Sequence, residues 1–284
     1  MELLQVLVTL VVVVSGMLLL GVLLLIDRNR LYATRRDIRE RIRIALPFVL
    51  VLGVVLLINA QFRRVFSDVS QVIGFHVTHT IFRIEGTFVV YFQRIFGEQF
   101  AAYFSFMYIY GYVFLLVFPL IAYFVLERME SFKAITIAYT ANYGIGVLCY
   151  TLFIAFGPRN LIADALYIGT PMYDQYSHLN LITSEANENT NVFPSLHTSL
   201  SATVMLFAWK TRGAYPRWFL IAWFTGVSII IATMYLGIHW FIDVVAGLGL
   251  AALSYWIGYA VVERELVSQL EVRKQWRRLV STFR

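Results

Sequence analysis

The sequence predicts an all-α fold, a polytopic membrane bundle of about seven transmembrane helices. Of the 284 residues, 60% are hydrophobic and only 14% are charged, and the mean hydropathy is +0.71. These values lie well outside the range of soluble globular domains. Apolar windows of about 20 residues, the length that crosses a bilayer, recur along the chain. The basic residues gather between alternate windows, as they do in multi-pass membrane proteins.

Seven apolar windows mark the predicted spans. The first lacks the basic start of a signal peptide and its apolar run is too long for one, so we interpret it as an uncleaved span. Between the second and third windows, residues 61–100 mix charged and apolar side chains, which predicts one or two helices lying in the membrane interface. The windows cover residues 5–26, 44–60, 101–126, 134–157, 194–209, 217–237 and 239–262.

The distribution of lysine and arginine predicts the orientation in the membrane. Eighteen of the 23 basic residues fall in segments 27–43, 127–133, 210–217 and 263–284. Basic loops favour the cytoplasmic side, so the N-terminus is expected outside and the C-terminus inside a cell membrane. The net charge of +6 then reflects topology and anionic lipid rather than nucleic-acid binding. The other five basic residues are Arg63, Arg64, Arg83, Arg94 and Arg159.

Three polar stretches are brought to the outer face by this orientation. They are "FGPRN" at 156–160, "FPSLH" at 193–197 and "MYLGIHWFID" at 234–243. An ionisable group costs about 2.5–3.5 kcal/mol at the centre of a membrane helix, so such groups near the bilayer mark functional sites. We therefore expect the three stretches to form one site.

The second stretch has the features of an anion-binding helix start. Pro194 suits the first helical position, the exposed N–H groups of the next residues attract negative charge, and Ser195 and His197 add donors in the same turn. The alternative is a serine that only caps the helix, beside a histidine that reaches the interface.

The third stretch pairs a histidine with a carboxylate. His239 and Asp243 are four residues apart, so on a helix they share a face, and the carboxylate can orient the imidazole for nucleophilic or base chemistry. Gly237 permits a tight turn just before them. The alternative is a structural His–Asp pair.

In the first stretch, the guanidinium of Arg159 suits a phosphoryl group. The alternative is an ordinary interfacial arginine.

At these residues the chain resembles the type 2 phosphatidic acid phosphatase superfamily. Its signatures are Lys-x6-Arg-Pro, Pro-Ser-Gly-His and Ser-Arg-x5-His-x3-Asp, and the resemblance covers roughly residues 134–262. "FPSLHTS" and "TMYLGIHWFIDVVAG" resemble most the inositol phosphorylceramide synthase branch. The resemblance implies a six-helix phosphatase-type core. We expect N-terminal spans and interfacial helices in residues 1–100, a core bundle with the active site in 101–262, and a basic cytoplasmic tail in 263–284.

The resemblance also implies a role for each residue. His239 would attack phosphorus and form a phosphohistidine, Asp243 would support it, and His197 would protonate the leaving alkoxide. Ser195 and Arg159 would bind the phosphate. The substrate would be a lipid phosphate or phospholipid at the extracytoplasmic face, with no cofactor or metal, and either water or an acceptor hydroxyl would complete the reaction.

Two cations of the signatures are missing from this sequence. Leu152 stands seven residues before Arg159, where the first signature has lysine, and Ala232 and Thr233 replace the Ser-Arg of the third. Because phosphoryl transfer depends on stabilising negative charge, another donor is needed. The candidates are Arg83, Arg94, Tyr235 and the N–H groups at the helix start.

The same residues are compatible with other functions. His197, His239 and Asp243 are an acceptable ligand set for a metal ion, although their spacing matches no metal-binding helix motif. A lipid transporter or scramblase could use the same polar cluster, but the chain shows neither repeated halves nor broken helices. The lone Cys149 excludes an intramolecular disulfide. The sequence leaves the oligomeric state open.

Overall fold

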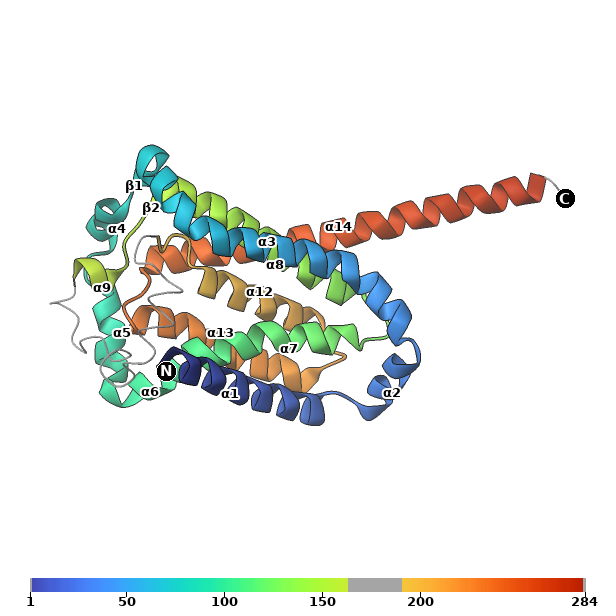
Figure 1. Ribbon diagram of the computed structural model, residues 1–284, viewed down its shortest axis with the longest axis horizontal. Helices are drawn as coiled ribbons and strands as arrows, with labels where there is room; N and C mark the ends of the chain where they lie inside the picture. Colours follow the sequence, from blue (N-terminus) through green and yellow to red (C-terminus); the bar gives the residue numbers. More distant parts are fainter. Residues whose placement is uncertain (1, 163–190, 283–284) are drawn as a thin grey trace.

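The computed structural model describes residues 2–162 and 191–282, which form a bundle of long helices (Figure 1). The long helices are α1 (Glu2–Leu25), α3 (Ile38–Ile73), α7 (Tyr112–Phe124), α8 (Glu130–Leu152), α12 (Leu196–Lys210), α13 (Pro216–Tyr235) and α14 (Phe241–Thr282). The shorter elements are α2 (Arg28–Arg36), β1 (Phe75–His76), α4 (Thr78–Glu85), α5 (Phe88–Phe96), η1 (Glu98–Phe100), α6 (Ala101–Phe106), the π-helical η2 (Met107–Gly111), β2 (Phe153–Ile154) and α9 (Pro158–Leu161). The all-α prediction is confirmed.

Five helical segments of the described chain are long and apolar enough to cross a membrane. They are Leu4–Leu25, Ile38–Gln61, Glu98–Phe124, Pro216–Tyr235 and Phe241–Glu265. The predicted spans at 134–157 and 194–209 form α8 and α12 but fall outside this set, so the count of seven stays a prediction. At 15 residues, α12 is about 22 Å long, shorter than the hydrocarbon layer.

The position of α12 explains its many small polar residues. It lies in the middle of the bundle, in contact with α7, α8, α13 and α14 (Figure 1). Its small polar residues are buried, and Asn142 of α8 donates from Nδ2 to Ser199 Oγ at 2.7 Å. A helix covered by other helices does not need a lipid-facing apolar surface, because its polar side chains face protein rather than lipid. The peripheral helices α1 and α3 instead expose most of their apolar side chains.

The helical region after the second span begins later than predicted. We expected interfacial helices from residue 61, but α3 continues as one helix to Ile73. The apolar window ends at Gln61, and the residues that follow continue the helix rather than break it. The short helices α4 and α5 then lie across one end of the bundle (Figure 1). Their location in the interface stays a prediction.

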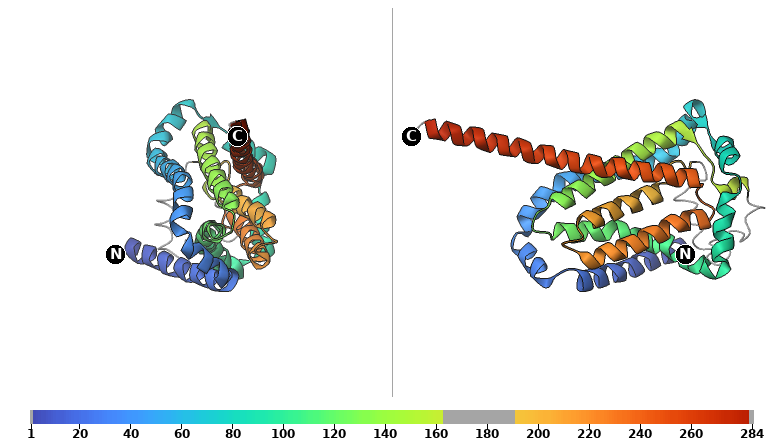
Figure 2. Two further views of the ribbon diagram at one scale, coloured as in Figure 1. Left: turned by 90° about the vertical axis from the view of Figure 1, so that its right-hand side faces the viewer. Right: turned by 180° about the vertical axis from the view of Figure 1, so that it is seen from behind.

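The last helix is much longer than the predicted span. α14 runs without interruption from Phe241 to Thr282, and its second half projects beyond the bundle as a straight rod (Figure 2). The predicted boundary at residue 262 therefore falls inside a continuous helix. The division of the chain into three parts and the cytoplasmic location of residues 263–284 stay predictions.

The three polar stretches meet at the end of the bundle where α4, α5 and α9 lie (Figure 1). A short parallel pairing of Phe75 with Phe153 and His76 with Ile154 ties the segment after α3 to the segment after α8. Beside it, the indole Nε1 of Trp240 donates to the carbonyl of Phe156 at 2.8 Å. The bond between Trp240 and Phe156 connects the first stretch with the third.

Candidate active site

A tight turn between α13 and α14 places His239. Gly237 has a φ of 65°, a conformation that favours glycine because it has no Cβ. The N–H groups of Ile238 and His239 both donate to the carbonyl of Thr233, at 3.0 and 3.1 Å. His239 therefore stands in the turn before α14, where its side chain is buried. The expectation that His239 and Asp243 share one helix is wrong, because the helix begins only at Phe241.

The turn nevertheless brings the two residues together. Oδ2 of Asp243 lies 3.6 Å from Nδ1 of His239 and accepts the N–H of Trp240 at 2.8 Å. Asp243 is fully buried, and among the described residues Nδ1 of His239 and Oδ1 of Asp243 are buried without a hydrogen-bond partner. The predicted proximity is thus present, as an ion-pair contact slightly longer than a hydrogen bond.

Helix α12 begins at Leu196, two residues after the predicted first helical position, Pro194. Ser195 caps the helix, and its Oγ accepts the N–H of Thr198 at 3.3 Å. The backbone N–H of Ser195 donates to the carbonyl of Asp243 at 3.1 Å. The capping alternative is therefore present in the structure. It leaves the hydroxyl proton of Ser195 for another acceptor, so a phosphate contact stays a prediction.

His197 lies in the first turn of α12 and faces His239. The two imidazole centroids are 6.4 Å apart. Two tyrosine rings hold His197 from the side of η2 and α7: Tyr108 stacks on it at 4.3 Å, and Tyr112 lies at 4.2 Å. Two imidazoles from separate parts of the chain thus lie close enough to contact one tetrahedral anion.

Arg159 is joined to the same turn through its backbone. Its N–H donates to the carbonyl of Gly237 at 3.0 Å, and its side chain is half-buried. The contact is close: a Cβ added to Gly157 would lie 2.3 Å from the carbonyl oxygen of Ile238. The structure therefore brings all five predicted site residues to one end of the bundle.

Three of the proposed additional donors can be placed in the structure. The hydroxyl of Tyr235 donates to the carbonyl of Gly97 at 2.8 Å, so its proton is already used away from the histidines. Arg83 and Arg94 are exposed, in α4 and α5. Within the part of the chain that the structure describes, no group of three His, Cys, Asp or Glu side chains is arranged to hold a metal ion.

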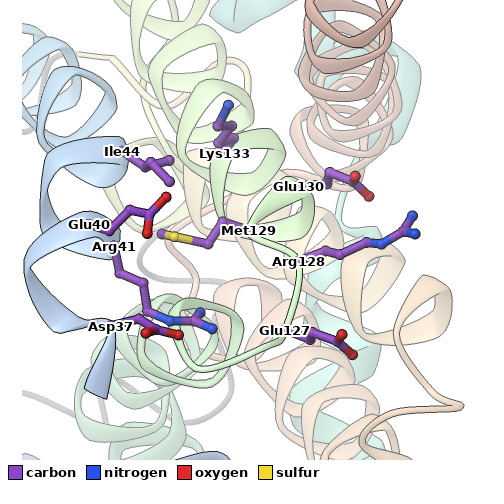
Figure 3. Close-up of a pocket in the computed structure, with 9 residues that line it drawn as sticks. All are labelled: Asp37, Glu40, Arg41, Ile44, Glu127, Arg128, Met129, Glu130 and Lys133. Atoms are coloured by element: carbon purple, nitrogen blue, oxygen red, sulfur yellow. The ribbon is translucent and has the colours of Figure 1, made fainter. Parts of the chain in front are cut away.

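A charged cavity lies at the opposite end of the bundle. It has a volume of about 330 Å³ and lies between the start of α3 and the start of α8 (Figure 3). Two of its basic groups are already bonded: Arg41 donates to the carbonyls of Phe124 and Leu126, and Lys133 pairs with Glu265 at 2.8 Å. These charged groups therefore hold the ends of neighbouring helices together. The lining of the cavity consists of Asp37, Glu40, Arg41, Ile44, Glu127, Arg128, Met129, Glu130 and Lys133.

A known family matches the part of the chain that contains these residues. The family model of the PAP2 superfamily matches residues 79–257, more than half of the chain. The chain belongs to the PAP2 superfamily. No curated protein and no solved structure matches it significantly. PAP2 membership supports a phosphatase or phosphotransferase type of activity.

The region matched to the PAP2 superfamily contains all five predicted site residues and most of α4. It therefore includes a residue that the sequence analysis missed. Both carboxylate oxygens of Glu85 accept backbone N–H groups at the start of α14. Burial raises the pKa of this carboxyl and the charge of Asp243 adds to the shift, while the two backbone hydrogen bonds oppose it. A glutamate in an amphipathic helix gives no signal of such a distant contact.

Proposed function

We propose that this PAP2 protein is a lipid-phosphate phosphatase or phosphotransferase that acts at the extracytoplasmic face through a phosphohistidine on His239. The observation that carries the proposal is the pair of imidazoles 6.4 Å apart, with the carboxylate of Asp243 beside one of them. A nucleophile supported by a carboxylate and an acid on the other side of the reacting phosphorus is the arrangement that phosphoryl transfer needs.

The proposal gives the two ring nitrogens of His239 different roles. Nδ1 of His239 faces Asp243, so a proton on Nδ1 is held by the carboxylate and Nε2 carries the lone pair that attacks. The contact of 3.6 Å is long for a hydrogen bond, but such contacts shorten when the substrate binds. Asp243 then stabilises the positive charge that develops on the ring.

The reaction has two steps. In the first, Nε2 of His239 forms a bond to phosphorus, the bond to the lipid oxygen breaks, and His197 gives its proton to the departing alkoxide. In the second, water or an acceptor hydroxyl attacks phosphorus, its proton passes to His197, and the bond to Nε2 breaks. Arg159 and Ser195 hold the phosphoryl oxygens, and the N–H groups at the start of α12 favour negative charge there.

The choice between hydrolysis and transfer depends on the second attacking group. The resemblance to the inositol phosphorylceramide synthase branch favours transfer of a phosphorylated head group to a hydroxyl of another lipid. The two missing signature cations agree with a phosphodiester, which carries less charge than a phosphomonoester. Both activities use the same phosphohistidine.

A labelling experiment tests the proposal. Purified full-length protein is mixed with dioctanoyl phosphatidic acid carrying radiolabelled phosphate and quenched in alkali, in which phosphohistidine survives. Label is expected on the wild type and on His79→Ala, a control in the exposed part of α4, and is expected to be absent from His239→Ala. Phosphate release identifies a phosphatase, and a new phosphodiester with an added polyol or lipid alcohol identifies a transferase.

Two results would contradict the proposal. One is that the wild type is labelled and the His239→Ala variant is labelled as well. The other is movement of the lipid between leaflets that depends on His239 while no phosphoryl product forms from phosphomonoesters or phosphodiesters, since that result favours a scramblase.

A further inference from the structure

Glu85 connects α4 to the first turn of α14. It is the last residue of α4, and its side chain is half-buried. Oε1 accepts the N–H of Phe241 at 2.8 Å and Oε2 accepts the N–H of Ile242 at 3.0 Å. The residue after it, Gly86, has a φ of 59°, so the chain turns away immediately and leaves the carboxylate against α14. Both oxygens of this one carboxylate thus accept hydrogen bonds from the first turn of α14.

The two N–H groups lie between the proposed nucleophile and its carboxylate. The next N–H toward His239, that of Trp240, is accepted by Asp243. The first N–H groups of a helix have no acceptor within the helix, and a negative charge there is favoured by the helix dipole. Two carboxylates therefore share three consecutive N–H groups. Asp243 acts from inside the turn, and Glu85 acts from another part of the chain.

The other end of α4 is attached to the segment that carries Arg159. The N–H of Val77 donates to the carbonyl of Ile154 at 3.0 Å, and the N–H of Phe156 donates to Oγ1 of Thr78 at 2.9 Å. Helix α4 therefore links the arginine segment to the histidine turn. A shift of α4 would change the position of both.

The His–Asp contact is sensitive to such a shift. Nδ1 of His239 and Oδ2 of Asp243 are 3.6 Å apart, a few tenths of an ångström beyond a good hydrogen bond. We propose that Glu85 is a positioning residue, which holds the first turn of α14 so that Asp243 closes on His239 during phosphoryl transfer. This inference rests on the proposed function, and it assigns a task to the region between the second and third spans.

Three variants of the full chain test the inference in a phosphate-release assay with dioctanoyl phosphatidic acid. Glu85→Ala removes both acceptors, Glu85→Gln keeps the size and one acceptor oxygen, and Glu98→Gln removes an exposed carboxylate at the same end of the bundle. A misplacement of the catalytic groups approaching 1 Å lowers kcat by about 10- to 100-fold, which is the loss expected for Glu85→Ala. KM is expected to stay within about twofold because the bonds of Val77 and Thr78 to the segment that carries Arg159 are kept. Glu85→Gln should lie between Glu85→Ala and the wild type, and Glu98→Gln should match the wild type.

Hydrogen–deuterium exchange of the same proteins provides a measurement that does not depend on activity. Amides of residues 236–245 are expected to exchange faster in Glu85→Ala, while those of α12 and α13 keep their protection. A folded Glu85→Ala protein with wild-type kcat overturns the inference, even if its thermal stability is lower, since the role would then be structural only. If the wild type itself releases no phosphate and forms no diester, the proposed function fails, and unchanged exchange in residues 236–245 then overturns the contact with Glu85 as well.

Discussion

Gly247 of α14 allows the start of α12 to approach the helix that carries Asp243. A Cβ at this position would lie 2.6 Å from the carbonyl oxygen of Ser195 and 3.1 Å from Cβ of Thr198. Both neighbours belong to the turn that holds His197. Replacement of Gly247 by alanine therefore acts directly on the distance between the two histidines. Gly249, two residues further along, has nothing within 4 Å of an added Cβ and supplies the matched control.

The size of the effect follows from these distances. Ordinary van der Waals contact begins at 3.4 Å, so the carbonyl of Ser195 must move by about 0.8 Å, the difference between 3.4 and 2.6 Å. Inserting a methyl group into a packed interface costs about 1–3 kcal/mol. Glycine to alanine in a helix otherwise gains about 1 kcal/mol. That gain is common to both variants, so Gly247→Ala should be about 1–3 kcal/mol less stable than Gly249→Ala.

The activity should fall more steeply than the stability. A displacement near 1 Å in the position of a catalytic group lowers the rate by up to about 100-fold, and His197 moves with Ser195. The measurements are the midpoint of thermal unfolding in detergent and the initial rate of phosphate release from dioctanoyl phosphatidic acid. Equal stability and equal rates for the two glycine variants would refute the packing argument, because they would mean that α12 and α14 are not in contact at this point.

Three further predictions follow from the site. Asp243→Asn keeps an acceptor for the N–H of Trp240 but loses the charge beside His239, so kcat should fall by about 100-fold or more in the phosphate-release assay. Arg159→Lys keeps the charge but not the fork of donors, and we expect kcat/KM to fall by about tenfold; an unchanged value would remove Arg159 from the phosphate site. Burial raises the pKa of Glu85 above its usual 4.5, so the folded state binds this proton more tightly than the unfolded state. Its contribution to stability should therefore decline as the pH rises from about 4.5 through the raised pKa, and thermal melts of Glu85→Gln should lack that part of the pH dependence.

Composition and local pattern were enough to predict the helical bundle and to select candidate residues for a site. Long apolar windows cannot satisfy their backbone in a bilayer except as helices, so hydropathy alone predicts α1, α13 and α14. Polar residues next to such windows are costly, and for that reason the stretches at 156–160, 193–197 and 234–243 were recognisable from the sequence. The alternation of the predicted spans also placed the three stretches at the same end of the bundle.

The tertiary structure decided how those residues are held. Whether His239 stands on a helix or in a turn depends on the left-handed conformation of Gly237 and on bonds to Thr233, and both depend on the packing of α13 against its neighbours. The contacts of Glu85 with α14 join residues more than 150 positions apart. Hydrophobic periodicity describes only neighbours within a few residues, so it carries no information about which distant side chain covers a helix start. The sequence by itself determined which groups are available for chemistry, and only the packing of distant segments determined their distances and orientations.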